Sequence, residues 1–223
     1  MIYVTGDTHA ERMHFTTYRV SPYWTEDDTL IICGDWSFLI RDNEVEHRFL
    51  DQLEQYPCTF CFVDGNHENF PAIFRYPEEI WNGGRVHRIR KNVLHLMRGQ
   101  IFTIEGKKIF TFGGAYSVDR KYRVLNESYW NEELPLPEEY REAIRNLELH
   151  SNEVDYILTH TAPREMIRLM GYEPDPCEME LAGFLEYLMY HVKHRHWFCG
   201  HWHMDQDLTD TFSILWYDTR KLE

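Results

Sequence analysis

The stretch TFCFVDGNHE, residues 59–68, decides the fold because it joins a buried strand to a cluster of polar side chains. Its apolar letters, residues 60–63, predict a strand, and the Asp-Gly pair that follows predicts a turn. Directly after the turn come Asn66, His67 and Glu68. From this stretch alone, a solvated loop and a functional site are both open interpretations.

Four further apolar runs end in a polar or glycine-containing turn in the same way. They cover residues 1–7, 29–35, 154–160 and 195–203. Runs with little polar alternation indicate strands that are buried on both faces of a sheet. We therefore expect a sheet protein whose strands all deliver polar residues at their carboxyl ends.

Helical spacing of apolar residues predicts three helices between the strands. They cover residues 43–56, 137–149 and 178–192. Asn43 with Glu46 resembles a capping box at the start of the first helix. Strands and helices in alternation place the chain in the α/β class.

The middle and the tail of the chain predict antiparallel strands. Residues 93–116 contain the turn EGKK between two alternating strands, which is typical of a hairpin, and residues 207–223 have a similar pattern. The segment 116–137 is polar, aromatic and interrupted by proline. We expect a single domain over residues 1–223, with the segment 116–137 as an excursion on the substrate side.

Composition limits the classes of partner. The chain has 223 residues, of which 43% are hydrophobic, so it can form a sizeable core. The net charge of −14 argues against a nucleic-acid groove and an anionic membrane surface, although a metal site could still attract phosphate. No apolar run approaches the roughly 18 residues of a membrane helix. The expected partner is a small molecule, and no feature indicates an oligomeric state.

Cysteine usage suggests a reducing compartment. The chain has five cysteines, and Cys58 and Cys61 fall in a strand-like run, where we expect buried free thiols. Reduced thiols favour the cytoplasm. Because the first apolar run begins at Ile2, we expect no signal peptide. We therefore expect a cytoplasmic protein.

The polar residues at the strand ends suit a metal site. They are Asp7, His9, Asp35, Asn66, His67, His160, His201 and His203. The carboxyl ends of strands in open α/β sheets collect ligands. Mixed carboxylate, amide and imidazole groups suit Mn, Fe or Zn better than Ca or Mg. The alternative is a set of unrelated polar turns, with His67 capping the next helix.

In order along the chain, D-x-H, G-D, G-N-H-E, a single His and G-H-x-H extend from Asp7 to His203. This series resembles the signature of the calcineurin-like metallophosphoesterases, in a small prokaryotic or phage form. The resemblance implies an α/β fold with a β-sandwich of two mixed sheets flanked by helices, in four layers ordered α-β-β-α. It also implies an enzyme that hydrolyses phosphate esters.

The resemblance further assigns a role to each residue of the series. Two divalent metals are expected, Mn²⁺ first, with Fe or Zn as alternatives. One metal would be held by Asp7, His9 and His203, the other by Asn66, His160 and His201, with Asp35 bridging them. A hydroxide between the metals would attack phosphorus, and His67 would donate a proton to the leaving group.

The chain departs from the family pattern at one position. Many members have G-D-x-x-D, and the second Asp orients the catalytic histidine, but this chain has Phe38 there. Either another group, Glu68 or a backbone carbonyl, replaces this carboxylate, or the pKa of His67 is less strongly tuned. The stretch also lacks the G-D-x-V-D-R-G run of protein serine/threonine phosphatases, which argues against protein substrates.

Substrate contacts are expected from the excursion, because Tyr116, Arg120 and Arg123 open it with positive charge. A solvated charge run explains these residues equally well. The first functional hypothesis is hydrolysis of a phosphomonoester or phosphodiester on a small or nucleotide-like substrate. A nuclease of the same superfamily and a non-catalytic interaction scaffold are the alternatives.

Overall fold

The computed structural model describes residues 1–223, and its strands form two sheets. The first sheet contains β1 (Ile2–Thr5), β2 (Thr29–Ile32), β3 (Thr59–Phe62), β4 (Glu78–Trp81), β5 (Gly84–Arg90), β6 (Val93–Leu96) and β13 (Thr219–Lys221). The second contains β7 (Gln100–Ile104), β8 (Lys107–Phe112), β9 (Tyr156–Thr159), β10 (His196–Cys199), β11 (Gln206–Thr209) and β12 (Phe212–Ile214). Their orders are β13-β1-β2-β3-β6-β5-β4 and β11-β12-β10-β9-β8-β7, and both sheets mix parallel and antiparallel pairs.

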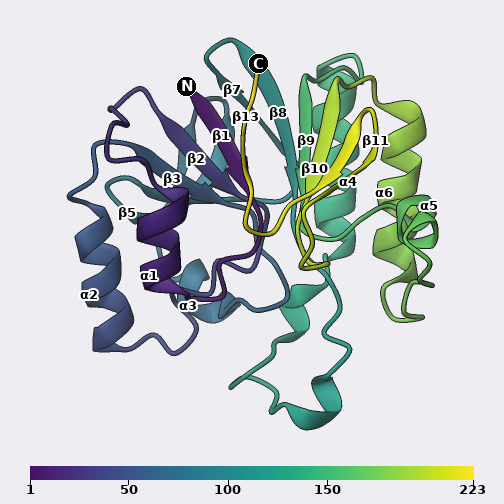
Figure 1. Cartoon of the computed structure of the whole chain (residues 1–223). Coiled ribbons are helices and arrows are strands. Elements are labelled where there is room, and N and C mark those ends of the chain that lie inside the picture. The colour runs from purple at the N-terminus through teal and green to yellow at the C-terminus, as the bar shows by residue number, and fades with distance from the viewer.

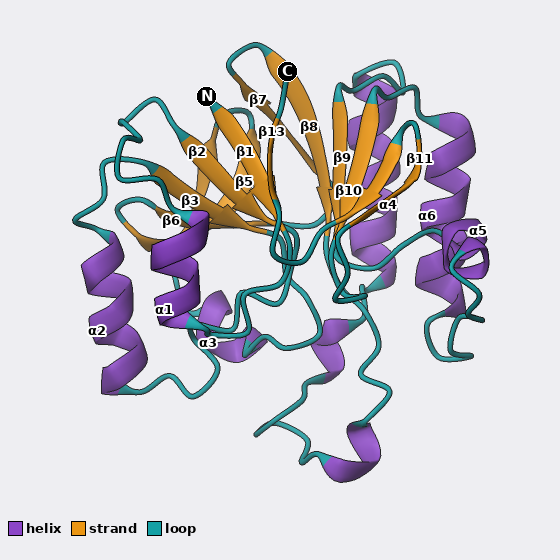
Figure 2. Cartoon of the chain, in the orientation of Figure 1, coloured by secondary structure: helices purple, strands orange, loops and turns teal.

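Helices cover the outer face of each sheet (Figure 1). On the first sheet lie α1 (Arg12–His14), α2 (Glu44–Leu53) and α3 (Phe70–Phe74). On the second lie α4 (Pro137–Leu149), α5 (Arg164–Leu169) and α6 (Met179–His191). The four layers follow the order α-β-β-α (Figure 2). The predicted fold class is therefore confirmed.

Side-chain alternation along the strands explains the layers. In β3, Phe60 and Phe62 pack among residues of the first sheet and its helices. Cys61 and the following Val63 point the other way, into a cluster that draws residues from both sheets. Because both faces are covered, these strands are apolar throughout, as the sequence predicted.

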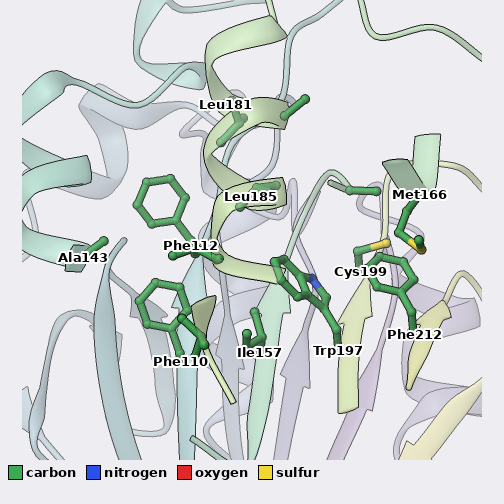
Figure 3. Packing of buried hydrophobic residues seen from close by; sticks show 14 of the residues in the cluster. Phe110, Phe112, Ala143, Ile157, Met166, Leu181, Leu185, Trp197, Cys199 and Phe212 are labelled. Atoms are coloured by element: carbon green, nitrogen blue, oxygen red, sulfur yellow. The ribbon is translucent and has the colours of Figure 1, made fainter. Parts of the chain in front are cut away.

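The outer face of the second sheet packs on α6. Phe112 and Trp197 belong to the same cluster as Leu181 and Leu185, which project from the helix toward the strands (Figure 3). Burial of one such side chain contributes about 1.5–3 kcal/mol. The apolar stripe predicted within residues 178–192 is thus a packing surface.

Most predicted elements are present, with three refinements. α4 has the predicted bounds, and the Asn43 side chain accepts the amide protons of Val45 and Glu46 at the start of α2. The hairpin β7–β8 turns at Glu105-Gly106, but β6 leaves the hairpin and joins the first sheet. β13 likewise leaves the tail hairpin and pairs with β1. The five similar apolar runs are divided between the two sheets.

The segment between β8 and α4, residues 113–136, extends from one end of the sandwich (Figure 1). It holds two short 3₁₀ turns, Arg120–Tyr122 and Asn131–Glu133, and is otherwise loop (Figure 2). It leaves the sandwich where the loops after β1, β2, β3, β9 and β10 also meet. None of the helices is long and apolar enough to cross a lipid bilayer.

Candidate metal centre

A first group of candidate ligands joins the loop after β1 to the loop after β10. His203 Nε2 lies 3.1 Å from Asp7 Oδ2, and His9 Nε2 lies 3.5 Å from the same oxygen. The two Nε2 atoms are 2.7 Å apart. Asp7 is buried, and its Oδ2 has no hydrogen-bond partner. These atoms are close enough together to bind one cation.

A second group lies beside the first and shares its carboxylates. His160 Nε2 is 3.4 Å from Asp35 Oδ1 and 3.0 Å from Asn66 Oδ1. Asp7, Asp35 and His160 form a second set that could hold a metal, so Asp7 borders both groups. His201 packs edge-on against His160 with ring centroids 4.9 Å apart, but it belongs to neither set.

Hydrogen bonds leave two lone pairs facing each other in the second group. His160 Nδ1 is 2.9 Å from the carbonyl oxygen of Cys33, so this nitrogen carries the proton that it donates. Asn66 donates from Nδ2 to Ser117 Oγ, which turns its Oδ1 toward His160 Nε2. A neutral His160 and Asn66 therefore present two acceptors at 3.0 Å. A cation or a proton at this place would stabilise them.

The charges of the site set the protonation of its histidines. Burial alone would lower the pKa of His160, but the carboxylates of Asp35 and Asp7 outweigh it, and the pKa is raised. The pKa of His9 is raised in the same way, against burial, chiefly by contact with Asp7. Burial, with His160 next, lowers the pKa of His201 to about 3, so this ring is neutral.

Three glycines let the candidate ligands approach one another. A Cβ on Gly34 would lie 2.1 Å from His160 Nδ1, and one on Gly65 would lie 2.1 Å from Asp35 Oδ1. A Cβ on Gly200 would lie 2.2 Å from Asp7 Oδ1. Each glycine thus makes room for a side chain from a different strand end.

Four of the candidate ligands also have left-handed backbone. The φ values are 44° at His9, 47° at Asp35, 68° at His201 and 47° at His203. Non-glycine residues rarely adopt this conformation, and such residues gather at functional sites. The tight turns after β1, β2 and β10 use it to direct these side chains into the site.

His67 lies at the edge of the cluster, and neither Glu68 nor a backbone carbonyl holds its ring. Its Nε2 is 3.3 Å from Nη2 of Arg123 and 3.9 Å from Asp35 Oδ2. Glu68 instead accepts the backbone amides of Trp36 and Ser37, and no carbonyl binds the ring. Burial, aided by Arg123 and opposed by Asp35, lowers the pKa of His67.

Phe38 does not stand in for the absent carboxylate. Its ring is fully buried and packs against Trp36 and Phe49, with centroids 4.6 Å and 4.5 Å apart. Trp36 is also buried in this cluster, where it stacks on Phe62. This aromatic packing therefore stabilises the loop after β2.

The three residues expected to contact substrate are separated in the structure. Arg123 reaches His67, whereas Arg120 binds the buried carboxylate of Glu133 through Nε at 2.8 Å. The Arg120 guanidinium also lies between the rings of Tyr116 and Tyr129, 4.6 Å and 4.9 Å from their centroids. In this arrangement Arg120 and Tyr116 anchor the excursion, and a substrate contact by either stays a prediction.

Two residues that the sequence did not single out support Asn66. The Glu133 carboxylate accepts from Ser117 N at 2.8 Å and from Ser117 Oγ at 2.9 Å. Ser117 Oγ in turn accepts from Asn66. The base of the excursion thus fixes the orientation of the Asn66 amide. No sequence pattern marks these residues, since the contacts depend on the path of the excursion.

The family model for calcineurin-like phosphoesterases matches residues 1–205. The chain belongs to this family, which confirms the resemblance drawn from the ordered strand ends. No curated protein matches the chain. The family and the two candidate ligand groups together support a metal-dependent phosphoesterase as the general class of this protein.

Proposed function

We propose that this protein is a dinuclear metal-dependent hydrolase of phosphomonoesters or phosphodiesters. The observation that carries the proposal is the meeting of two ligand groups around the buried carboxylates of Asp7 and Asp35. The residues that would hold the metals are Asp7, His9, Asp35, Asn66, His160, His201 and His203. Mixed oxygen and nitrogen donors suit Mn, Fe or Zn better than Ca or Mg, and we propose Mn²⁺ first, with Fe or Zn as alternatives.

Bound divalent cations would supply charge for the phosphate oxygens and lower the pKa of a bound water from 15.7 to roughly 7. Asp35 would lie between the two groups, because its Oδ1 is near His160 and its Oδ2 is 3.7 Å from His9. The orphaned Asp7 Oδ2 and the facing acceptors of His160 and Asn66 fit such cations.

His67 would protonate the leaving group. Its ring is partly exposed at the edge of the cluster, and its Nε2 lies between Asp35 and Arg123. In the free protein the donors of Arg123 favour an unprotonated Nε2. A phosphate dianion would pair with Arg123 and raise the pKa of His67, so substrate binding would favour the acid form.

The nuclease and scaffold alternatives have less support. A nucleic-acid groove is disfavoured by the net charge of −14. A scaffold has no need of the two buried carboxylates of Asp7 and Asp35 beside a group of histidines. We propose a small phosphate ester as substrate and the cytoplasm as location. The four buried free cysteines agree with a reducing compartment.

The test is hydrolysis of p-nitrophenyl phosphate and bis-p-nitrophenyl phosphate, with the purified protein stripped of metal and reloaded with Mn²⁺, Fe²⁺ or Zn²⁺. We expect metal-stimulated release of nitrophenolate and its loss in Asp35→Asn. Asp210→Asn, at an exposed turn with no side-chain partner, is the matched control. No metal-stimulated hydrolysis of either compound would contradict the proposal.

A further inference from the structure

A cavity of about 720 Å³ opens beside His9 and His67. Its walls come from the start of α1, the loop before α2 and the excursion. Three arginines, one from each wall, line it: Arg12, Arg41 and Arg123. In a chain with net charge −14, three cationic side chains around one cavity mark a site for an anion.

Several guanidinium N–H groups of these arginines have no acceptor in the protein. Arg41 is exposed, and its guanidinium makes no hydrogen bond or ion pair. The Arg12 guanidinium meets no acceptor and lies over the ring of Phe49, 5.5 Å from the centroid. Arg123 binds Asp119 through Nε and the carbonyl oxygen of Ser128 through Nη1, which leaves Nη2 toward His67.

Two glutamates also line the cavity, and neither forms an ion pair with an arginine side chain. Glu46 is buried, and both of its oxygens accept the backbone N–H of Arg41, at 3.1 Å and 2.9 Å. Glu127 is exposed and forms no ion pair. The guanidinium groups of Arg12 and Arg41 therefore have no carboxylate partner and remain available to an anion.

The cavity lies on the leaving-group side of the site. His67 lines it, and His67 is the residue that would protonate the leaving oxygen. Whatever is attached to that oxygen would extend past Arg123 into the space between Arg12 and Arg41. Its volume falls within the roughly 300–1,000 Å³ of small-ligand pockets.

We infer that this cavity is a second anion subsite, and that the substrate is a small phosphate ester whose leaving group carries another phosphate. The inference rests on the proposed function. In hydrolysis, water oxygen bonds to the scissile phosphorus while the bond from phosphorus to the leaving oxygen breaks. That oxygen keeps the electron pair and takes the proton of His67. The other phosphate stays on the released alcohol, held by the arginines.

The first test compares adenosine 5′-monophosphate with adenosine 3′,5′-bisphosphate on the Mn²⁺-loaded enzyme, by phosphate release. In the bisphosphate, whichever phosphate reacts, the other is on the leaving alcohol. We expect kcat/KM to be at least about tenfold higher for the bisphosphate, and Arg41→Gln to reduce this ratio about tenfold. Arg48→Gln is the control, because Arg48 is exposed on α2, pairs only with Glu44 and does not line the cavity. It should keep the wild-type ratio.

The second test uses binding and does not depend on turnover. Calorimetric titration of metal-free protein with adenosine 3′,5′-bisphosphate should give a Kd about tenfold weaker in Arg41→Gln than in Arg48→Gln. If this holds while no ester is hydrolysed, the subsite stands and the proposed function fails. If esters are hydrolysed but Arg41→Gln and Arg48→Gln have the same kcat/KM ratio and the same Kd, the proposal of a second anion subsite is wrong. Preference for a short oligodeoxynucleotide over the bisphosphate would also overturn the small-molecule substrate.

Discussion

The two sheets contribute different side chains to the candidate metal centre. The loops of the first sheet supply both carboxylates, the amide and His9, whereas the loops of the second sheet supply His160, His201 and His203. Neither sheet alone provides a complete group, because Asp7 needs His203 and Asp35 needs His160. The centre therefore forms only when the sandwich closes, so folding and metal binding should be coupled.

The largest effect is expected from the carboxylate that lies between the groups. Asp35→Asn keeps the shape but removes the charge that attracts cations, and we expect a fall in kcat of about 10³-fold. Steady-state assays with p-nitrophenyl phosphate measure this fall, and metal content is checked in the same samples. If Asp35→Asn bound both metals and kept full activity, the carboxylate from the first sheet would not have the role that we assign to it.

We expect the loop after β2 to tolerate no carboxylate at position 38, where many members of the family have Asp. Phe38→Asp would bury a charge in the aromatic cluster and remove its packing, at a cost of about 3–5 kcal/mol or more. Denaturant unfolding of the metal-free protein measures the loss, with Phe38→Leu as the milder comparison. A stable Phe38→Asp enzyme with improved activity would show instead that the position can still serve His67.

A smaller effect is expected from the support of Asn66. Ser117→Ala removes the group that orients the amide, and we expect affinity for one metal to fall about 10–100-fold. Calorimetric titration with Mn²⁺ resolves the two sites, and Ser21→Ala in a surface loop is the control. If Ser117→Ala and Ser21→Ala bound Mn²⁺ with equal affinity, the excursion would not influence metal binding through Asn66.

A further effect is the pH dependence of metal binding, which belongs to the histidines. The pKa values of His160 and His9 are raised, so protons compete with metal from above the ordinary histidine range downward. We expect Mn²⁺ affinity to fall as pH decreases from 8 to 6, by about tenfold per unit for each proton displaced. Calorimetry in buffers of different ionisation enthalpy counts these protons. A pH-independent affinity would contradict the assignment of His160.

The strand-end residues could be found from the sequence because each follows a continuous apolar run. Parallel strands bring such ends together, and the order of the residue types identified the family. The division of the runs between two sheets was not visible, since β3 and β9 look alike when both faces are buried. Other features depend on the paths of loops, whose sequences have no periodic pattern. They are the partner of His67, the hydrogen bonds through Ser117, and the cavity lined by Arg12 and Arg41.

We expect the left-handed backbone at four candidate ligands to influence how fast the protein is degraded in a cell. These ligands are His9, Asp35, His201 and His203. Each such residue costs of order 1 kcal/mol, against a total stability of about 5–15 kcal/mol for a typical domain. Bound metal would offset this cost, and a chain without metal would spend more time open to proteases. We therefore expect the abundance of this protein to follow the supply of its metal, and a pulse-chase experiment under chelation would reveal it as faster turnover.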